Sequence, residues 1–594
     1  MAVQRARPRS EDCGSGQLAP GSFPEDVLQT LVEPVGTGCF PMGRPISSPS
    51  LCLGVQIRLG GLLLALPAAS ALAGCLSLAE QKAAADEEVY ALVASRRARL
   101  GSTAEPLVVE PPVDSTASRL RAQLVAEVQP VLPPLDLIDC LELAAESNRE
   151  YQTRRENLYL TALDLTLERF RLGWRPFADG AAGVGGDLVD AQSTTGNLSA
   201  GFQRLLGSGA QVVANLGTGL FENLLSSDGE GLTTNFALGI TQPLLRGAGR
   251  LVTVEPLRQA ERNLIYEVRS FERFRRTLAF DVATLYYRIL QVEENLANAV
   301  ANAESLRDVT ERNEALAQAG RLRDIQVDQA RQDELRAVSS VINARQNLQG
   351  QMDDFALFLG LPVGTTIQLD KSALAALASR GLQVAEMSES DALKIGLERR
   401  LDLRNAVDQL TDARRRVEIA ANGLESFFDL TADIGGTSDL GQPFDYGRDD
   451  INWNVGFNFD LPVGRLPERN LWRAALIGVQ ASARSAEQLE DQIRSSIRDA
   501  LRELEARRQD YQIQADAVEL SERRVESVQL FLEAGEAQTR DLLEAQAALV
   551  QAQNARVAAL VDYRLSLLAL WRDTELLAVD ESGLGRLDED TNTL

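Results

Sequence analysis

Three stretches of the chain alternate between apolar residues and polar or glycine residues. Residues 451–461 do so without interruption, residues 428–435 form an expected partner, and residues 236–240 repeat the pattern earlier in the chain. A period of two residues predicts β-strands. An apolar face opposite a face of Asn, Gly and Asp fits membrane barrel strands with lipid outside and water inside. A half-buried sheet in a soluble domain is the alternative interpretation.

Two of these runs end at a proline that is followed by a long helical segment. We expect Pro243 and Pro462 to mark strand-to-helix exits, because proline cannot donate to a ladder and suits a first helical turn. From Pro243 to Gly320 is 77 residues, and from Pro462 to Gly535 is 73 residues. As mostly continuous helices, these segments would be about 110 Å long. Such helices need a coiled-coil partner.

The two long segments carry the same heptad pattern. Counted back in steps of three and four, ten of twelve positions before Gly320 are apolar, as are nine of twelve before Gly535. A sustained period of 3.5 residues predicts coiled-coil packing, and the shared phase indicates an internal duplication. Helical composition resumes after each glycine for about 40 residues, so each glycine is the predicted tip of a helical hairpin. The two halves begin near Leu135 and Ala392.

Composition excludes several classes of function. The 594 residues carry a net charge of -25, which argues against general nucleic-acid binding. The chain has no histidine, which lowers the case for most hydrolases and zinc enzymes. None of the five cysteines forms a CxxC pair, so no zinc ribbon or redox motif is supported. We therefore expect no enzyme, cofactor or metal site.

The apolar run at residues 59–73 has the features of a secretory signal: a preceding Arg58, 15 residues that are too short to span a bilayer comfortably, and small residues at its end. It continues into Leu72-Ala73-Gly74-Cys75, which resembles a bacterial lipobox, so Cys75 is the predicted lipidation site. A plain signal cut near Ala73 or a buried helix is the alternative. Residues 1–54 do not fit a signal peptide, and we expect an overlong gene start with Met42 as a better initiator.

From residue 135 to 578 the chain resembles the TolC family of outer-membrane efflux proteins. The likeness rests on LDLIDCLELAAESN (135–148), ITQPLLRGAGR (240–250), ALKIGLERRLDLRNA (392–406) and FDLPVGRLPERN (459–470). In the third of these, Leu401 stands where the family usually has a proline. The resemblance implies a mainly α-helical protein with a membrane β-barrel. It implies a trimeric channel-tunnel in which long antiparallel coiled-coil hairpins continue from a shared twelve-stranded barrel.

Four strands from each protomer would form that barrel, but the interval from Trp174 to Pro243 is about thirty residues longer than its counterpart. The excess contains residues 207–221, which are Gly-rich and alternating. Residues 190–230 would therefore add either an extracellular hairpin or further barrel strands.

The predicted organisation has five parts. They are a lipoprotein signal with an overlong start (1–74), an extended lipidated tether rich in proline (75–134), a first repeat (135–380), a second repeat (381–578) and a loose acidic tail (579–594).

The hairpin tips are the predicted functional sites. In the family motif an acidic residue follows the tip glycine by six positions, and an alanine follows by ten. Gly535, Asp541 and Ala545 match it, whereas Gln326 replaces the acid after Gly320. The resemblance implies that Asp541 and Glu544 form rings of carboxylates at a periplasmic gate; a solvated helix face is the alternative. Gly320, Arg321, Leu322, Gln326, Gly535 and Leu542 are the predicted tip and adaptor-docking residues.

Together these features predict a lipid-anchored outer-membrane protein with its helical tunnel in the periplasm. It would be the passive exit duct of a tripartite efflux or type I secretion system. Its partners would be outer-membrane lipid, two further copies of itself, a periplasmic adaptor and an inner-membrane transporter. The alternative is a periplasmic adaptor, which also carries a helical hairpin but lacks the duplication and the aromatic-rich strands. An enzyme with paired carboxylates is the third and weakest reading.

Overall fold

The computed structural model describes residues 77–99, 108–110, 114–126, 132–186, 192–223, 231–382, 387–580 and 583–586. All of them belong to one compact unit, Ser77–Leu594. The predicted signal at 59–73 and the predicted lipidation site Cys75 lie outside these residues. Within the described part of the chain, no helix is long and apolar enough to cross a membrane.

The two halves of the chain repeat one order of elements. In the first half, α4 (Leu137–Ser147) and α5 (Arg149–Leu172) lead into strands, followed by α6 (Arg250–Thr253), α7 (Glu255–Gln318) and α8 (Asp324–Phe358). In the second half, α10 (Glu389–Arg399) and α11 (Leu401–Asn422) lead into strands, followed by α12 (Leu466–Ala534) and α13 (Thr539–Asp573). A short helix, α9 (Ser372–Arg380), lies between the halves. The predicted duplication and helical hairpins are therefore present in the fold.

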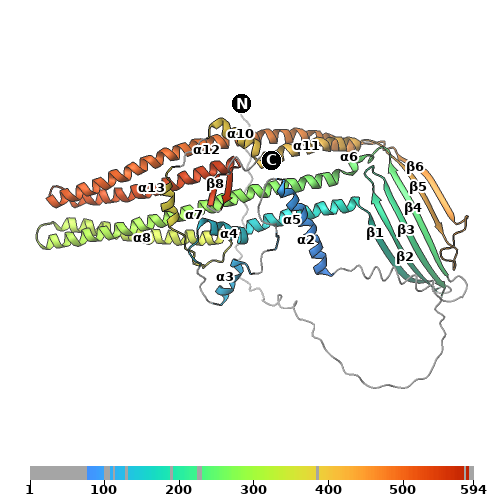
Figure 1. Ribbon diagram of the computed structural model, residues 1–594, viewed down its shortest axis with the longest axis horizontal. Helices are drawn as coiled ribbons and strands as arrows, with labels where there is room; N and C mark the ends of the chain where they lie inside the picture. Colours follow the sequence, from blue (N-terminus) through green and yellow to red (C-terminus); the bar gives the residue numbers. More distant parts are fainter. Residues whose placement is uncertain are drawn as a thin grey trace, which may run out of the picture. The chain divides into compact units, whose positions relative to one another are not determined.

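The helical hairpins turn at the predicted glycines. Gly320 has φ 69° and Gly535 has φ 80°, a left-handed conformation that glycine adopts without steric cost. At each tip the next amide reaches back five residues, from Arg321 to the Leu316 carbonyl (2.9 Å) and from Glu536 to the Phe531 carbonyl (2.8 Å). These bonds satisfy carbonyl groups that the helix end leaves without partners. Both tips lie at the end of the unit opposite the sheet (Figure 1).

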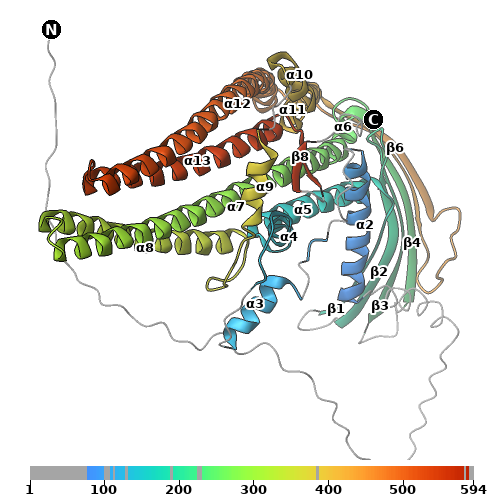
Figure 2. The ribbon, with the colours of Figure 1, turned by 60° about the vertical axis from the view of Figure 1, so that its left-hand side comes forward.

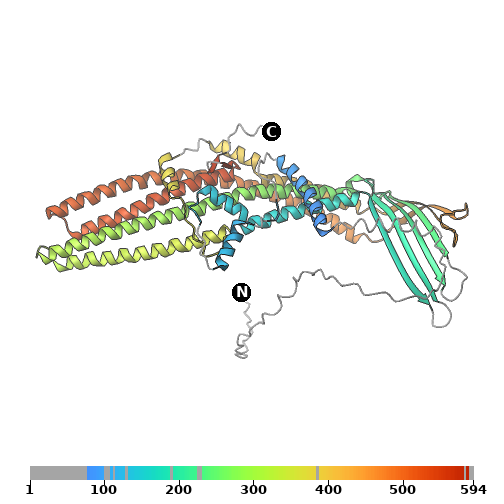
Figure 3. The same ribbon diagram turned by 60° about the horizontal axis from the view of Figure 1, so that its bottom comes forward.

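The sheet contains six antiparallel strands in sequence order: β1 (Arg175–Gly186), β2 (Gln192–Leu205), β3 (Gln211–Asn223), β4 (Gly231–Pro243), β5 (Phe427–Thr437) and β6 (Ile451–Asp460). The first half supplies four strands and the second half supplies two. The extra residues before Pro243 thus form strands β2 and β3, which pair within the sheet. Figure 3 shows the sheet as one curved layer.

The main core lies where the repeats meet, midway along the helices. Tyr286 and Phe271 of α7 are buried there with Phe355 of α8, and Leu568 of α13 is fully buried in the same cluster. From this core the hairpins α7–α8 and α12–α13 extend toward the tips, while α7 and α12 also continue toward the sheet. Ile493 and Ile497 of α12 are buried in a second, smaller cluster with Ala392 of α10 and Leu403 of α11.

The predicted extended tether is wrong for the described part of residues 75–134. It contains α2 (Leu78–Ala98) and α3 (Thr116–Val125). Helix α2 packs against α5 and α7 (Figure 2), with Val89 and Val93 fully buried. A capping box at Ser77 and Glu80 starts this helix, and the prolines that suggested an extended chain lie beyond its end.

The predicted loose tail also begins with ordered structure. Strands β7 (Leu577–Asp580) and β8 (Gly583–Arg586) form a small hairpin. Leu577 and Leu584 are buried in the main core, and the Arg564 guanidinium of α13 donates to the Leu584 carbonyl (2.8 Å). The predicted boundary at residue 578 therefore falls inside a strand that belongs to the core.

Candidate functional site

The two faces of the sheet differ in chemistry across all six strands. The cross-strand pairs Leu430–Phe457 and Ile434–Trp453 lie on one face, and Thr431–Gly456 and Asp433–Asn454 lie on the other. The register of the remaining strands continues both rows. Large apolar side chains on the first face are exposed, including Trp453 at 74% and Phe457 at 60%. A soluble half-buried sheet would cover this face. Within the described unit the loop between β5 and β6 covers only one end of it, where the Tyr446 ring packs on Phe236 (5.0 Å between ring centres).

The opposite face carries Asn, Asp, Ser, Thr and Gly. Here the Ser199 hydroxyl donates to the Asp179 carboxylate (2.7 Å), and the Asn454 amide donates to the Asp433 carboxylate (3.3 Å). These side chains are partnered with each other and open to solvent, which suits a wall that borders water.

The predicted strand exits are placed correctly, but their prolines do not start helices. Pro243 is the last residue of β4, and Pro462 follows the end of β6 at Asp460. The prolines in the first helical turns are Pro256 of α7 and Pro467 of α12. A turn with Gly247 at φ 83° and Gly249 at φ 92° separates Pro243 from the helices. The prediction expected one proline both to end the strand and to start the helix. In the fold, one proline ends the strand and a second one lies in the first helical turn.

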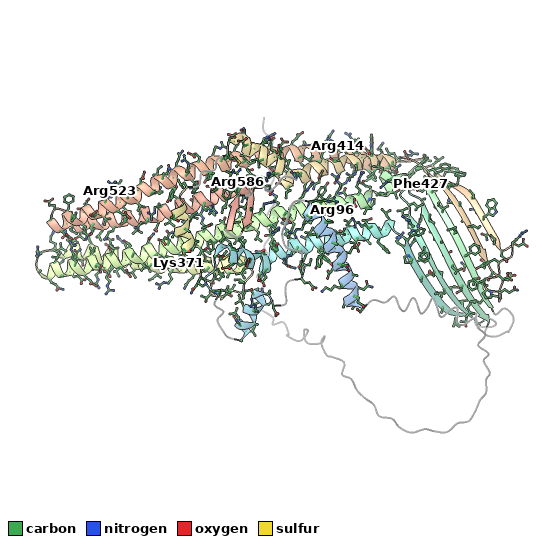
Figure 4. The ribbon with its side chains drawn as sticks, in the orientation of Figure 1. Arg96, Lys371, Arg414, Phe427, Arg523 and Arg586 are labelled. Carbon is green, nitrogen blue, oxygen red and sulfur yellow. The ribbon has the colours of Figure 1, made fainter. Side chains whose placement is uncertain are left out.

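Aromatic and arginine side chains gather where the sheet meets the helices. Arg204 lies over the Trp174 ring (5.3 Å to the ring centre), and Arg246 lies over the Phe427 ring (4.6 Å). Figure 4 places Phe427 at this junction. Arg246 also pairs with Glu468 of α12 (3.4 Å), so the two strand exits are tied together.

At the tips, the alanines of the predicted motif are packing residues. Ala330 and Ala545, each ten positions after a tip glycine, are fully buried. Near them, Asn313 of α7 is 2% exposed and its amide donates to the Thr539 hydroxyl of α13 (3.4 Å). The first hairpin is therefore joined to the second by a polar contact at the tip.

That contact is the last of a series between α7 and α13. Asn298 donates to Asn554 (2.9 Å), and Gln546 donates to Ser305 (2.8 Å). Sequence reasoning missed these pairs because the heptad pattern locates apolar seams and gives no signal for polar contacts between hairpins.

The predicted gate acids lie in the first turns of α13. The Asp541 carboxylate accepts a bond from the Gln538 amide (3.0 Å) as part of a capping box. Arg540 approaches Asp541 (3.9 Å) and Glu544 (3.7 Å). Asp541 thus has a structural role in starting the helix, while Glu544 is exposed.

The predicted docking residues differ in exposure. Arg321 is exposed and Leu322 and Gln326 are half-buried, whereas Leu542 is only 3% exposed. Leu542 therefore supports the tip from inside and offers little surface to a partner. Two apolar tip residues that the sequence analysis did not select are exposed, Ile325 at 58% and Phe531 at 53%. Their positions outside the apolar seam could have identified them.

The described residues contain no group of three or more Cys, Asp and Glu arranged to hold a metal ion. No protein-family model and no curated protein matches the sequence. The fold, however, is similar to solved structures. The channel-forming protein CusC aligns with a TM-score of 0.55 at 15% identity, over 74% of this chain and 91% of that one.

The Campylobacter jejuni CmeC outer-membrane channel aligns with a TM-score of 0.54 at 16% identity, over 77% of this chain and 87% of that one. The open state of the Neisseria gonorrhoeae MtrE outer-membrane channel aligns with a TM-score of 0.51 at 18% identity, over 77% and 91%. At these identities the likeness establishes the fold, which is that of an outer-membrane channel.

Proposed function

We propose that this protein, which has the fold of outer-membrane channels, is the passive exit duct of a tripartite efflux or type I secretion system. It carries solutes from the periplasm to the exterior, and it has no catalytic activity of its own. The observation that carries the proposal is one sheet with an exposed apolar face and a polar opposite face, joined to two long helical hairpins. The sheet suits a lipid bilayer, and the hairpins suit the aqueous space beneath it.

The described unit is incomplete as a channel. Its sheet has two free edges, at β1 and β6, and lipid does not tolerate unpaired strand edges. Several copies must therefore join edge to edge. By resemblance to the TolC family we propose a homotrimer, with Cys75 lipidated in the outer membrane and the helices in the periplasm.

The tips supply the partner surface in this proposal. Arg321, Ile325 and Phe531 are exposed there. A periplasmic adaptor with its own helical hairpin would pack against them and connect the duct to an inner-membrane transporter. Asp541 and Glu544 would line the mouth of the tunnel between the tips.

The alternative, a periplasmic adaptor, accounts for less of the fold. An adaptor uses one hairpin, whereas this chain carries two related ones. It has no use for a sheet whose Trp453, Val455, Phe457 and Phe459 are 58–74% exposed.

Planar-bilayer recording of the purified full-length protein tests the proposal. We expect discrete channel openings in pure lipid, and loss of export from cells when the gene is deleted. Retention of the substrate's export in the deletion strain, together with no conductance from folded protein, would contradict it. Neighbouring genes for an adaptor and a proton-driven transporter would favour efflux over secretion.

A further inference from the structure

The hairpin of β2 and β3 is an insertion relative to the internal repeat. The second half supplies β5 and β6 alone, whereas the first half supplies β1 and β4 with this hairpin between them. β1 runs away from the helices and β4 returns to them, so these two would form a hairpin on their own. The insertion therefore separates two strands that the duplication would place side by side.

The inserted strands have the properties of wall strands. β2 pairs with β1 over twelve residues and with β3 over thirteen, and β3 pairs with β4 over eleven. Leu198, Phe202, Leu216 and Leu220 continue the apolar face and are 37–55% exposed. Asn197, Ser199 and Gln203 alternate with them on the polar face. A hairpin that lay in water outside a barrel would not need this alternation.

The turn of the hairpin is anchored at the level where the other strands end. The Ser208 hydroxyl donates to the Gln242 side chain (2.9 Å), and the Gly249 amide donates to the Ser208 carbonyl (2.9 Å). Gly209 has φ 95°, and a Cβ there would lie 2.6 Å from the Gly247 carbonyl oxygen. Ala210 is 1% exposed. β2 thus ends and β3 begins beside the end of β4, and both strands cross the same layer.

We propose that the assembled protein closes an eighteen-stranded barrel, because each of three copies contributes six strands. The proposal rests on the trimer of the proposed function. β1 runs outward and β6 runs back toward the helices, so joining β6 of one copy to β1 of the next keeps the antiparallel alternation. An even number of antiparallel strands is the rule for single-chain bacterial barrels.

The consequence is a wide exit. Barrel diameter grows roughly linearly with strand number, and barrels of about 16–18 strands leave an aqueous channel. Eighteen strands give a bore about half as wide again as twelve strands. The outer-membrane segment then admits bulky hydrated cargo, and selection by size takes place at the hairpin tips.

Cryo-electron microscopy of the full-length protein in lipid nanodiscs counts copies and strands separately. Three copies around eighteen strands support the proposal. Three copies around twelve strands, with residues 187–230 outside the wall, overturn it and leave the proposed duct intact. Any other copy number overturns the eighteen-strand count together with the proposed trimer.

A pair of neighbouring substitutions on β2 tests the wall assignment in function. Leu198→Arg should reduce the yield of assembled oligomer severalfold, because its side chain faces lipid. Asn197→Arg, on the lumen face, should assemble like the wild type. Equal assembly of both variants overturns the proposal.

The bore is measured by polymer exclusion from the external side. We expect the wild type to admit larger polyethylene glycols than a variant in which a two-residue turn replaces residues 187–230. Equal exclusion limits in two folded channels would overturn the proposal. If the shortened variant does not fold, the strand count from cryo-electron microscopy and the comparison of Leu198→Arg with Asn197→Arg still test the proposal.

Discussion

Two adjacent side chains on β6 test which face of the sheet meets lipid. Phe457 lies on the exposed apolar face, and Asn458 lies on the polar face. We expect Phe457→Arg to destabilise the assembled protein by about 2–4 kcal/mol if the position lies near the bilayer midplane, and by less near an interface. Asn458→Arg should be nearly neutral. The heat resistance of oligomers on gels measures the difference, and equal tolerance of both variants would count against the assignment.

A buried ion pair fastens α2 to the long helix α7. The Arg97 guanidinium donates to Glu272 (2.8 Å), and Arg275 donates to the other carboxylate oxygen (2.9 Å). Both members of the first pair are 8% exposed at the side chain. Glu272→Gln should destabilise this junction by about 3 kcal/mol, because it removes the negative charge from the buried carboxylate that pairs with Arg97 and Arg275. Faster hydrogen exchange in α2 of the Glu272→Gln variant than in the wild type, with unchanged exchange in α13, would confirm that the ion pair holds α2 in place.

The same pair predicts a dependence on pH. Burial alone would raise the pKa of Glu272, but Arg275 and Arg97 outweigh it and hold the pKa below its ordinary value. The unfolded chain then binds more protons in the window between the two pKa values, so stability increases with pH there. Protection of α2 should be constant from pH 7 to about 5 and decline below about pH 4, where a free glutamate gains its proton. Glu272→Gln should flatten this decline; an unchanged profile would assign it to other groups.

At the scale of single residues, the sequence predicted conformation better than contacts. The predicted turns at Gly320 and Gly535 are present, because a tight turn between two helices needs a residue with positive φ. Asp541 was predicted as a gate residue, and the capping role that occupies its carboxylate was missed. Leu542 was selected for docking, but its side chain is turned inward. Which side of a helix is covered depends on the neighbouring hairpin, and no local pattern encodes that.

Where α8 ends, one glycine controls how two elements meet. Gly360 has φ 83°, and a Cβ at this position would lie 1.9 Å from the Ser147 carbonyl oxygen at the end of α4. Gly360→Ala should therefore destabilise the helical region by about 2 kcal/mol or more, from the left-handed backbone and the collision.

Gly350, within α8, is the control, because a Cβ there has no atom within 4 Å. Gly350→Ala should stabilise the protein by up to about 1 kcal/mol. Thermal unfolding followed by circular dichroism measures both variants. A decrease in melting temperature for Gly350→Ala, or none for Gly360→Ala, would contradict the assignment.

Among the elements, those with a strong period were predicted well. The long helices and the strands β4, β5 and β6 carry clear periods of 3.5 and two residues, and all are present. Helix α2 was missed because prolines farther along suggested an extended segment. The number of strands stayed open because the alternation of residues 207–221 indicates a strand without naming its neighbours, and only pairing with β1 and β4 decides where such strands lie.

For the whole assembly, the proposed gate makes a prediction about current. In a trimer, three copies of Asp541 and Glu544 would surround the tunnel mouth, and multivalent cations would bind there and block conductance from the periplasmic side. Asp541→Asn with Glu544→Gln should weaken this block at least tenfold. The asparagine retains an oxygen for the Gln538 amide, so the helix start is preserved.

A double variant away from the tip is the control. Asp516→Asn with Glu519→Gln removes two exposed acids of α12, and should leave the block unchanged. Planar-bilayer recordings with a trivalent cation compare the three proteins. If the block is the same in all, the acids belong to a solvated helix face, and the channel proposal survives without this gate.

The order of the strands in the sheet also determines how the chain can fold. β1 to β4 pair with their immediate neighbours across short loops, but the nine pairs of β4 and β5 must wait for residues 244–426, which contain the whole first hairpin. Closing a long loop costs entropy before its contacts form, and non-local pairings slow folding. The first four strands can therefore form a local meander early, while the β4–β5 ladder closes last. Pulsed hydrogen exchange during refolding should protect amides in the β2–β3 ladder before those that join β4 to β5.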